Sequence, residues 1–209
     1  MLRYNRSVLP RNLRPMRLSR RTEPFDSDDY VFELKVDGFR SLAHVQSGHA
    51  QLVSRNGNVF RGFAELATWI AEHLQVEDAV LDGEIACVDE AGRPNFRDLL
   101  FRQRQCVFIA FDLLYLNGKD VRVLPLLERK AALRKLLRRK RSRILYLDHI
   151  ESDGCLLFEQ IVKMNLEGIV CKRKDSPYKV TGKPSPHWIK IKNPRYSQAE
   201  RREELFDRV

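Results

Sequence analysis

Short runs of apolar and β-branched residues, bounded by turn residues, recur along this chain and predict a protein built mainly from strands. The runs cover residues 30–34, 39–45, 51–54, 79–88, 106–116, 144–148, 169–172 and 188–192. The run at 106–116 is the most apolar and indicates a buried strand. By alternation, Phe111 in this strand shares a face with Ile109 and Leu113.

Apolar residues recur at helical spacing in other segments, at 63–74, 126–143 and 154–164, and a further short helix is predicted over 95–103. The segment 126–143 carries nine Lys and Arg residues beside a stripe of leucines. It predicts an amphipathic helix with a strongly basic outer face. Such a face is usually only solvated, but this density exceeds what solubility requires, so we favour contact with phosphates.

The first candidate for chemistry lies between two predicted strands, in the pattern Lys35-x-Asp37-Gly38-x-Arg40. Asp-Gly is a turn dipeptide, so the flanking strands are predicted to form a hairpin with Lys35 at the end of the first strand. A lysine held there can be partly desolvated or placed beside other cations, which lowers its pKa and allows the amine to attack an electrophile. The alternative is an ordinary solvated lysine beside an ordinary turn.

Two further strands carry charged residues in patterns that suit a ligand pocket. A glycine inside a strand, here Gly83, often marks a bulge or the close approach of a ligand, and it places the carboxylate of Glu84 beside that point. In the last strand, Lys190 and Lys192 alternate with isoleucines, so the two cations share one face. Cations about 6–7 Å apart on one strand face suit a polyphosphate.

Five more motifs follow the first pattern in order along the chain. They are Ser54-Arg55-Asn56-Gly57, Leu81-Asp82-Gly83-Glu84, Phe111-Asp112-Leu113-Leu114-Tyr115-Leu116, Glu167-Gly168-Ile169-Val170-Cys171-Lys172 and Trp188-Ile189-Lys190-Ile191-Lys192. With the first pattern, they resemble motifs I, Ia, III, IIIa, IV and V of the ATP-dependent DNA ligases. These ligases belong to the covalent nucleotidyltransferases, with the RNA ligases and mRNA capping enzymes. The resemblance extends from about residue 24 to residue 200.

The resemblance implies an α+β fold in which two twisted antiparallel sheets, flanked by helices, hold ATP in the groove between them. It implies ATP and Mg²⁺, or Mn²⁺, as cofactors and nicked double-stranded DNA as the partner. Lys35 is implied as the catalytic residue, which forms a lysyl-AMP phosphoramidate. Glu167 is implied as the residue that holds the metal ion near the phosphates.

The resemblance also implies the nucleotide contacts. Glu33 and the backbone of Leu34 are expected at the edge of the adenine, and Phe111 against its face. Arg40 and Glu84 are expected at the ribose, and Glu84 is alternatively a metal ligand. The remaining cations, expected at the phosphates, are Arg55, Lys172, Lys190 and Lys192.

One departure from the resembled pattern concerns an arginine. Many ligases carry it about six residues before the residue that matches Lys190, and here Pro184 occupies that place. Lys183 is the candidate substitute for the missing cation.

The composition of the chain indicates a cellular compartment and a class of partner. A formal net charge of +10 over 209 residues and a pI near 9.7 favour a polyanionic partner such as nucleic acid. The four cysteines have neither metal-ligand nor disulfide-framework spacing, so we interpret them as small buried hydrophobes in a reducing compartment. No apolar run has membrane-spanning length and no secretory signal is recognisable, so we expect a cytoplasmic, nucleoid-associated bacterial protein without a membrane partner.

The predicted organisation is one catalytic domain with basic flanks. Residues 1–21 carry seven arginines and no acidic residue, and they are interpreted either as a basic arm that grips phosphates or as a solvated tail. The adenylation domain is assigned to residues 22–200 and a C-terminal tail to residues 201–209. In the resembled ligases an OB domain follows motif V, and the organisation predicted for this sequence contains none. We therefore expect that an OB-domain or end-joining protein acts in trans, that the basic segments compensate, or that the chain performs part of the reaction.

The favoured function is the adenylation domain of an ATP-dependent DNA ligase, similar to small bacterial ligases and to the ligase domain of bacterial end-joining enzymes. It would transfer AMP to the 5′-phosphate of a nick for sealing in repair or recombination. Two alternatives remain. The first is an RNA ligase or a capping-type guanylyltransferase, which nucleotide preference would distinguish. The second is a non-catalytic DNA-binding relative, for which DNA binding would be unchanged by Lys35→Ala and no covalent nucleotide would form.

Overall fold

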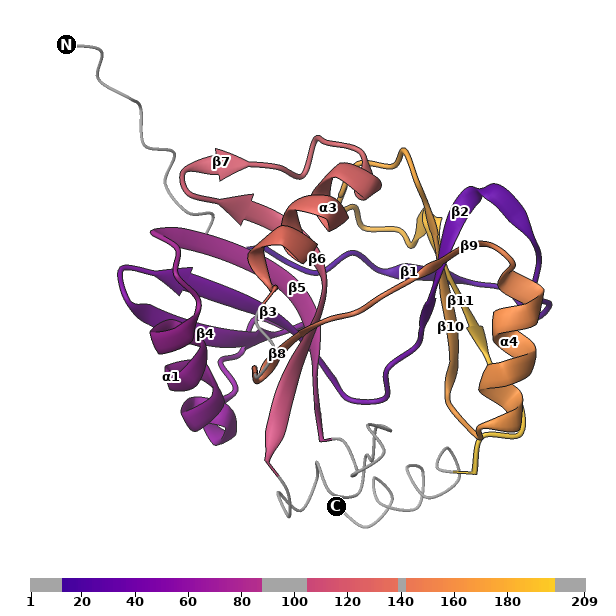
Figure 1. Cartoon of the computed structure of the whole chain (residues 1–209), viewed down its shortest axis with the longest axis horizontal. Coiled ribbons are helices and arrows are strands. Elements are labelled where there is room, and N and C mark those ends of the chain that lie inside the picture. Colours follow the sequence, from indigo (N-terminus) through magenta and orange to yellow (C-terminus); the bar gives the residue numbers. More distant parts are fainter. Residues whose placement is uncertain (1–12, 88–104, 139–141, 198–209) are drawn as a thin grey trace.

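The computed structural model describes residues 13–87, 105–138 and 142–197, whose strands form two sheets (Figure 1). Sheet A contains, in spatial order, β1 (Leu18–Arg20), β11 (Ser185–Lys192), β10 (Gly168–Arg173), β2 (Ser27–Leu34) and β9 (Ile150–Ser152). Sheet B contains β4 (His49–Ser54), β3 (Phe39–Gln46), β5 (Asp78–Cys87), β6 (Cys106–Leu116) and β7 (Lys119–Asp120), and β8 (Ile144–Tyr146) also pairs with β6. Neighbouring strands are antiparallel, except that β1 is parallel to β11 and β8 is parallel to β6.

Helices cover the outer faces of the two sheets. The helical elements are η1 (Arg61–Phe63), α1 (Ala64–His73), α3 (Leu126–Leu136) and α4 (Gly154–Lys163). α1 packs on sheet B and α4 packs on sheet A, while α3 lies beside β6 (Figure 1). This arrangement confirms the predicted α+β class with two sheets that are mostly antiparallel and flanked by helices.

The segment from Lys35 to Gly38 does not form the predicted hairpin, because β2 belongs to sheet A and β3 to sheet B. The Lys35 amide still donates to the carbonyl of Gly168 (2.8 Å), which extends the ladder between β2 and β10. The chain then crosses from one sheet to the other. At Gly38 a Cβ atom would lie 2.2 Å from the carbonyl oxygen of Ile85, so the glycine is required by close approach to β5.

The alternation predicted for β6 is interrupted by the bulge that Gly83 suggested. Asp82 pairs with Asp112 but Gly83 pairs with Ala110, so Phe111 is an extra residue with no partner on β5. The prediction that Phe111 and Leu113 share a face is therefore wrong. Leu113 packs in the core beneath α1, whereas Phe111 lines a pocket between the sheets.

The predicted helix at 126–143 is shorter than expected, because α3 ends at Leu136. The chain has already entered strand pairing at Arg143, whose carbonyl accepts a hydrogen bond from the amide of Phe108 (2.7 Å). Residues 139–141 lie outside the described part of the chain.

The basic face predicted for this segment is also less complete than expected, because Arg129, Lys130 and Arg143 are buried. The guanidinium of Arg129 makes two hydrogen bonds of 2.8 Å to the carboxylate of Asp112 on β6. Lys130 pairs with Glu33 on β2. Buried cations need such acceptors to replace their lost hydration. The exposed cations of the segment remain candidates for phosphate contact.

The described part of the predicted N-terminal arm packs against the rest of the domain. Leu13 and Met16 are buried, and β1 extends sheet A beside β11. Residues 1–12, the predicted helix at 95–103 and the tail at 201–209 lie outside the described residues. Within the described ranges, every helix is too short or too polar to cross a membrane.

Candidate active site

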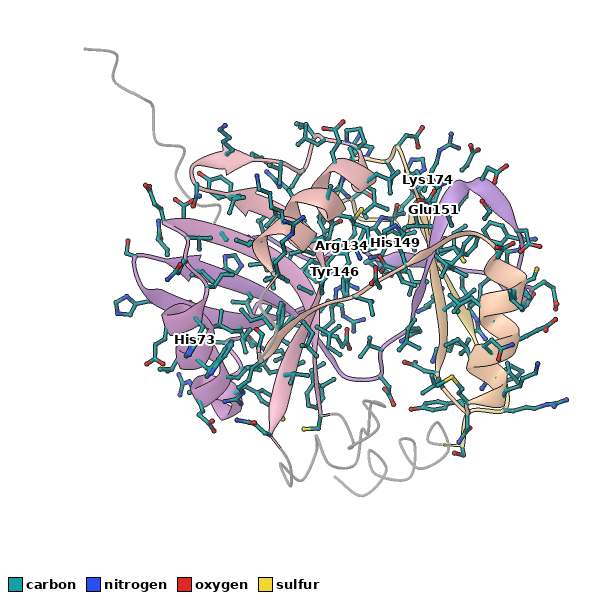
Figure 2. The ribbon with its side chains drawn as sticks, in the orientation of Figure 1. His73, Arg134, Tyr146, His149, Glu151 and Lys174 are labelled. Carbon is teal, nitrogen blue, oxygen red and sulfur yellow. The ribbon has the colours of Figure 1, made fainter. Side chains whose placement is uncertain are left out.

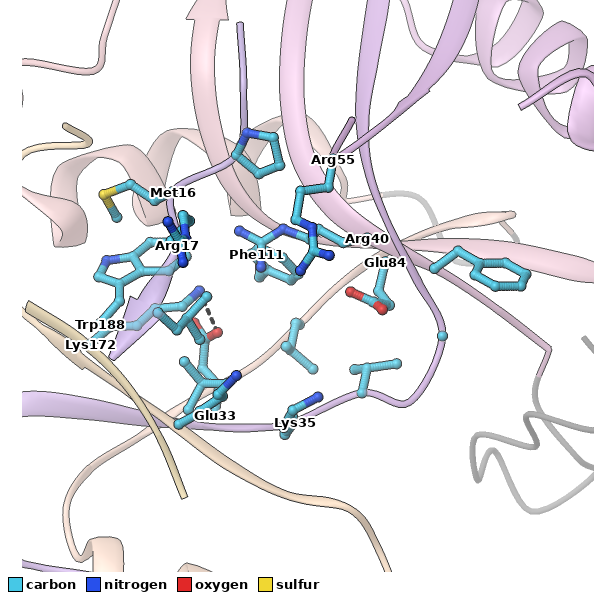
Figure 3. A pocket seen from close by; sticks show the side chains of 18 of the residues that line it. Met16, Arg17, Glu33, Lys35, Arg40, Arg55, Glu84, Phe111, Lys172 and Trp188 are labelled. Carbon is cyan, nitrogen blue, oxygen red and sulfur yellow. Dashed lines mark ion pairs between the residues drawn. The ribbon is translucent and has the colours of Figure 1, made fainter. Parts of the chain in front are cut away.

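A pocket of about 710 Å³ lies between the two sheets and gathers most of the predicted site residues (Figure 3). Nine of the eleven line it: Glu33, Leu34, Lys35, Arg40, Arg55, Glu84, Phe111, Lys172 and Lys190. The other two join the site through ion pairs, because Glu167 pairs with Lys35 and Lys192 pairs with Glu167. The structure thus brings these residues together, and their individual roles remain predictions.

The Lys35 end of the pocket combines cations and carboxylates. Nζ of Lys35 donates to Oε2 of Glu167 at 2.6 Å, and the Lys35 side chain is 20% exposed. The other oxygen of Glu167 lies 3.8 Å from Nζ of Lys192. Burial raises the pKa of Glu84 to about 7, although Lys35 and Arg40 act in the opposite direction. This end can therefore bind a polyphosphate and accept a proton.

Lys190 projects into the same end from β11, as the alternation of that strand predicted. Burial lowers its pKa, and the nearby cations Lys35, Lys192 and Arg20 lower it further. A cluster of cations that repel one another in this way is suited to bind an anionic ligand, because the ligand relieves the repulsion.

Another part of the pocket contains a buried carboxylate held by two lysines. Glu33 lies 2.5 Å from Nζ of Lys130 and 2.6 Å from Nζ of Lys172, and all three side chains are 1–2% exposed. Burial by itself would raise the pKa of Glu33, but the two lysines lower it. Burial also lowers the pKa of Lys172 to about 8, which Glu33 only partly offsets. Lys172 therefore lies against Glu33 rather than beside Glu167.

The aromatic wall of the pocket consists of Phe111 and Trp188. Nζ of Lys172 lies 4.3 Å from the ring centroid of Phe111 and 4.0 Å from that of Trp188. The guanidinium carbon of Arg40 lies 4.5 Å from the Phe111 centroid. Both cations are in range for a cation–π interaction, so the aromatic rings help to hold cations inside the pocket.

A buried network fixes Arg40. Its guanidinium makes two hydrogen bonds of 2.6 Å to the fully buried carboxylate of Asp82, which also accepts from the hydroxyl of Tyr178 at 2.6 Å. That hydroxyl accepts a hydrogen bond from the amide of Met16 (2.9 Å). The network therefore connects the N-terminal segment to the pocket wall.

The segment after β11 fixes the other side of the Lys35 loop. The hydroxyl of Tyr196 donates to Oδ2 of Asp37 at 2.8 Å, and both residues are buried. The side-chain amide of Asn193 donates to the carbonyl of Leu166, next to Glu167. These contacts restrain the loop on which Lys35 lies.

The cations at the rim of the pocket differ from the prediction in one respect. Arg55 is exposed and lines the pocket just after β4, but Lys183 is exposed and is not among the lining residues. Arg17 lines the pocket instead, and its guanidinium donates to the carbonyl of Gly182 (3.1 Å). The cation near this loop thus comes from the N-terminal segment.

The carboxylates fit a metal ion that takes most of its ligands from a bound substrate. Among the described residues no group of three His, Cys, Asp or Glu side chains is placed to hold a metal by itself. Glu84 and Glu167 interact electrostatically across the Lys35 end of the pocket. Mg²⁺ commonly binds through one or two carboxylates together with phosphate oxygens, and this donor set meets that requirement.

Sequence reasoning missed several residues of the site. Asp82 and Trp188 lay inside recognised motifs but were not selected, and Arg17 was counted only as part of a basic arm. Lys130 did have a signal. Helical spacing places it between Leu126 and Leu133 on the buried face of α3, where a lysine needs a partner.

Comparisons with known proteins identify relatives over most of the chain. A family model described as the ATP dependent DNA ligase domain matches residues 15–192. The SPbeta prophage-derived DNA ligase-like protein LigB of Bacillus subtilis is 32% identical over 192 residues, covering 88% of this chain and 68% of that protein. The multifunctional non-homologous end joining protein LigD of Pseudomonas aeruginosa is 32% identical over 170 residues, covering 78% of this chain and 20% of LigD.

Solved structures of DNA ligases also resemble this chain. A mycobacterial DNA ligase D complexed with ATP and MES has a TM-score of 0.73 and 31% identity, covering 87% of this chain and 60% of that chain. A Chlorella virus DNA ligase-adenylate, with a TM-score of 0.58 and 17% identity, shows the shared fold alone. The chain spans 20% of the LigD from Pseudomonas aeruginosa and 31% of the LigD from Bacillus subtilis.

Proposed function

Because this chain belongs to the ATP-dependent DNA ligase family, we propose that it performs the adenylation chemistry of a DNA ligase with Lys35 as the nucleophile. The observation that carries the proposal is the position of Lys35. Its amine lines the pocket between the sheets and donates to Glu167 at 2.6 Å, and Lys190 and Lys192 lie on β11, which pairs with β10.

In the first step, Nζ of Lys35 attacks the α-phosphorus of ATP. A nitrogen–phosphorus bond forms, the bond from the α-phosphorus to the pyrophosphate oxygen breaks, and Nζ loses a proton. Glu167 orients the amine through its hydrogen bond. Lys190 and Lys192 offset the negative charge that develops on the phosphate, because cations already fixed in place need no reorganisation during the reaction.

The rest of the pocket orients the nucleotide. Glu33 and the backbone of Leu34 take the edge of the adenine, Phe111 takes its face, and Arg40 and Glu84 take the ribose. This assignment is supported by their common position in one pocket.

Arg55 and Lys172 complete the set of cations that bind the nucleotide. Arg55 is exposed at the rim and can reach phosphates there, while the buried Lys172 stands against Glu33. Mg²⁺ or Mn²⁺, held by Glu167 and Glu84 together with phosphate oxygens, supplies electrostatic stabilisation of the phosphate charge when bound.

The later steps require DNA. AMP passes from Lys35 to the 5′-phosphate of a nick, and the 3′-hydroxyl then displaces AMP and forms the phosphodiester bond. A net charge of +10 supports a polyanionic partner. The relatives named for non-homologous end joining support a role in DNA repair. An OB-domain or end-joining protein that acts in trans is a further candidate partner.

The proposal is tested by incubating the protein with α-labelled ATP or GTP and Mg²⁺ and measuring label that survives denaturing electrophoresis. We expect label from ATP, none with Lys35→Ala, and unchanged labelling with Lys163→Ala, an exposed lysine on α4. Label from GTP alone would indicate a guanylyltransferase, and no label from either nucleotide would contradict the proposal. Sealing of a labelled nick, with and without an added OB-domain protein, then tests the later steps.

A further inference from the structure

We propose that Lys130 is a positioning residue of the nucleotide pocket, which holds Glu33 so that its carboxylate recognises the 6-amino group of an adenine base. The proposal rests on the proposed function in so far as the pocket binds ATP. It concerns a residue of α3 that lies outside the six recognised motifs and does not line the pocket. Lys130 therefore acts through Glu33 and not by touching the nucleotide.

Lys130 connects the two sheets behind the pocket. Its Nζ donates to Oε1 of Glu33 in sheet A (2.5 Å) and to the carbonyl of Leu147 (3.1 Å), which follows β8 of sheet B. Both acceptors belong to residues that line the pocket. Nζ also lies 4.7 Å from the ring centroid of Tyr146, whose position is labelled in Figure 2. The amine of Lys130 is therefore held by a carboxylate, a carbonyl and an aromatic ring.

Burial separates Lys130 from the exposed cations of its helix. Lys130 is 1% exposed, whereas Arg134, one turn further along α3, is 63% exposed and lies at the surface beside Tyr146 (Figure 2). A buried amine cannot reach a DNA phosphate. Taking it out of water costs several kcal/mol unless a fixed acceptor compensates. Helical spacing favours a leucine at this position. A buried lysine here therefore indicates that its charge has a function.

The function of this charge is to hold the carboxylate of Glu33, which Lys130 and Lys172 bind together. Lys130 binds one oxygen of Glu33. Lys172, which lines the pocket, binds the other oxygen (Figure 3). The pair keeps the carboxylate ionised and sets its plane. An ionised carboxylate has about four acceptor positions and no donor, so positions remain for an amino group of a ligand. Adenine presents an amino group at C6, whereas guanine presents a carbonyl oxygen that a carboxylate repels.

The fold around α3 does not depend on Lys130 alone. The neighbouring Arg129 anchors the same helix independently, through two hydrogen bonds to Asp112 and one to the carbonyl of Ser176 (2.9 Å). Replacing Lys130 by methionine keeps most of the side-chain volume and removes the charge. We therefore expect the variant to fold, with Glu33 held by Lys172 alone and the plane of its carboxylate no longer fixed.

The test measures base discrimination by binding, so that it does not depend on covalent chemistry. Dissociation constants are measured for ATP and for purine riboside triphosphate, which lacks the 6-amino group, in protein carrying Lys35→Ala. We expect ATP to bind about tenfold to a hundredfold more tightly than the analogue, and Lys130→Met to remove most of this ratio. Lys135→Met, which removes an exposed lysine from the same helix, should leave the ratio unchanged.

A purely structural role for Lys130 would weaken the binding of both nucleotides equally and keep their ratio, and this result would overturn the proposal. Should Lys130→Met fail to fold, the double variant Glu33→Gln/Lys130→Met removes both charges of the pair. We expect its ratio to equal that of Glu33→Gln alone. A ratio that falls further in the double variant would show that Lys130 acts on the base without Glu33, contrary to the proposal. Failure of covalent labelling would contradict the proposed function while leaving these binding ratios measurable.

Discussion

Nζ of Lys35 lies 2.6 Å from Oε2 of Glu167, although the two residues are separated by 132 positions in the chain. They meet because the backbone of Lys35 continues the ladder between β2 and β10, where its amide bonds to Gly168. Glu167 precedes that glycine, whose φ of 147° lies in a region that favours glycine. Lys35 directly follows β2 and Glu167 directly precedes β10, so the two residues lie side by side.

This relationship leads to a prediction for Glu167→Gln. The amide can still accept a hydrogen bond from Lys35 but carries no charge to balance Lys35 and Lys192 or to bind a metal ion. We expect lysyl-AMP formation to slow by about a hundredfold or more, measured by single-turnover labelling at saturating Mg²⁺. A rate within a few fold of the original protein would limit Glu167 to orienting the amine. Glu159→Gln, an exposed carboxylate on α4, is the matched control.

Gly38→Ala tests the crossing between the sheets. The added methyl group would lie 2.2 Å from the Ile85 carbonyl oxygen and 2.8 Å from Cγ of Glu84, so β5 or the Lys35 loop must move. We expect the free energy of unfolding to fall by about 1–3 kcal/mol in chemical denaturation, together with a loss of lysyl-AMP formation. Gly182→Ala should change neither quantity, because among the described residues no atom apart from its chain neighbours lies within 4 Å of the added methyl.

Tyr196→Phe tests the contact that restrains the Lys35 loop from the C-terminal side of β11. The substitution removes a hydrogen-bond donor from the buried carboxylate of Asp37, which lies two residues after the nucleophile. We expect a loss of about 1–2 kcal/mol in the free energy of unfolding and a several-fold slower formation of lysyl-AMP. Tyr30→Phe removes a hydroxyl from β2 and serves as the control. Unchanged labelling in Tyr196→Phe would show that Asp37 keeps the loop in place through its other contacts.

The pKa of Lys172 leads to a prediction about stability and pH. Burial lowers this pKa to about 8, below the ordinary lysine value of about 10.4, so the unfolded chain binds the proton more tightly than the folded protein. The resulting cost is present in full below about pH 8 and disappears as the pH rises towards about 10. Stability that depends on Lys172 therefore increases with pH in this window.

We expect Lys172→Met to be more stable than the original protein at pH 7, by about 1–3 kcal/mol, because it removes a buried cation whose desolvation Glu33 only partly offsets, while Glu33 keeps Lys130 as its partner. The advantage should shrink between about pH 8 and pH 10, as followed by denaturant unfolding at several pH values. Nucleotide binding should weaken in the same variant. Lys163→Met, which removes an exposed lysine, should show no such pH dependence. A constant difference between pH 7 and pH 10 would contradict the lowered pKa.

Local pattern was sufficient to predict most of the strands and helices and the candidates for chemistry. The apolar run of β6, the alternation of Lys190 and Lys192, and the bulge at Gly83 are all properties of a few neighbouring residues, and the structure has them as expected. Hydrophobic period and turn chemistry depend on residues that are close in the chain, so they can be read without a fold.

Pairing between distant segments was decided only in three dimensions. The Lys35 loop crosses between sheets because β2 finds its partner in β10, more than a hundred residues later, and not in β3. Because of the bulge, Phe111 lines the pocket whereas Leu113 packs in the core. Lys130 is buried and not part of the predicted basic surface, because it pairs with Glu33 in the pocket wall. In each case the outcome depends on which buried partner compensates a charge or completes a ladder, and that partner is distant in sequence.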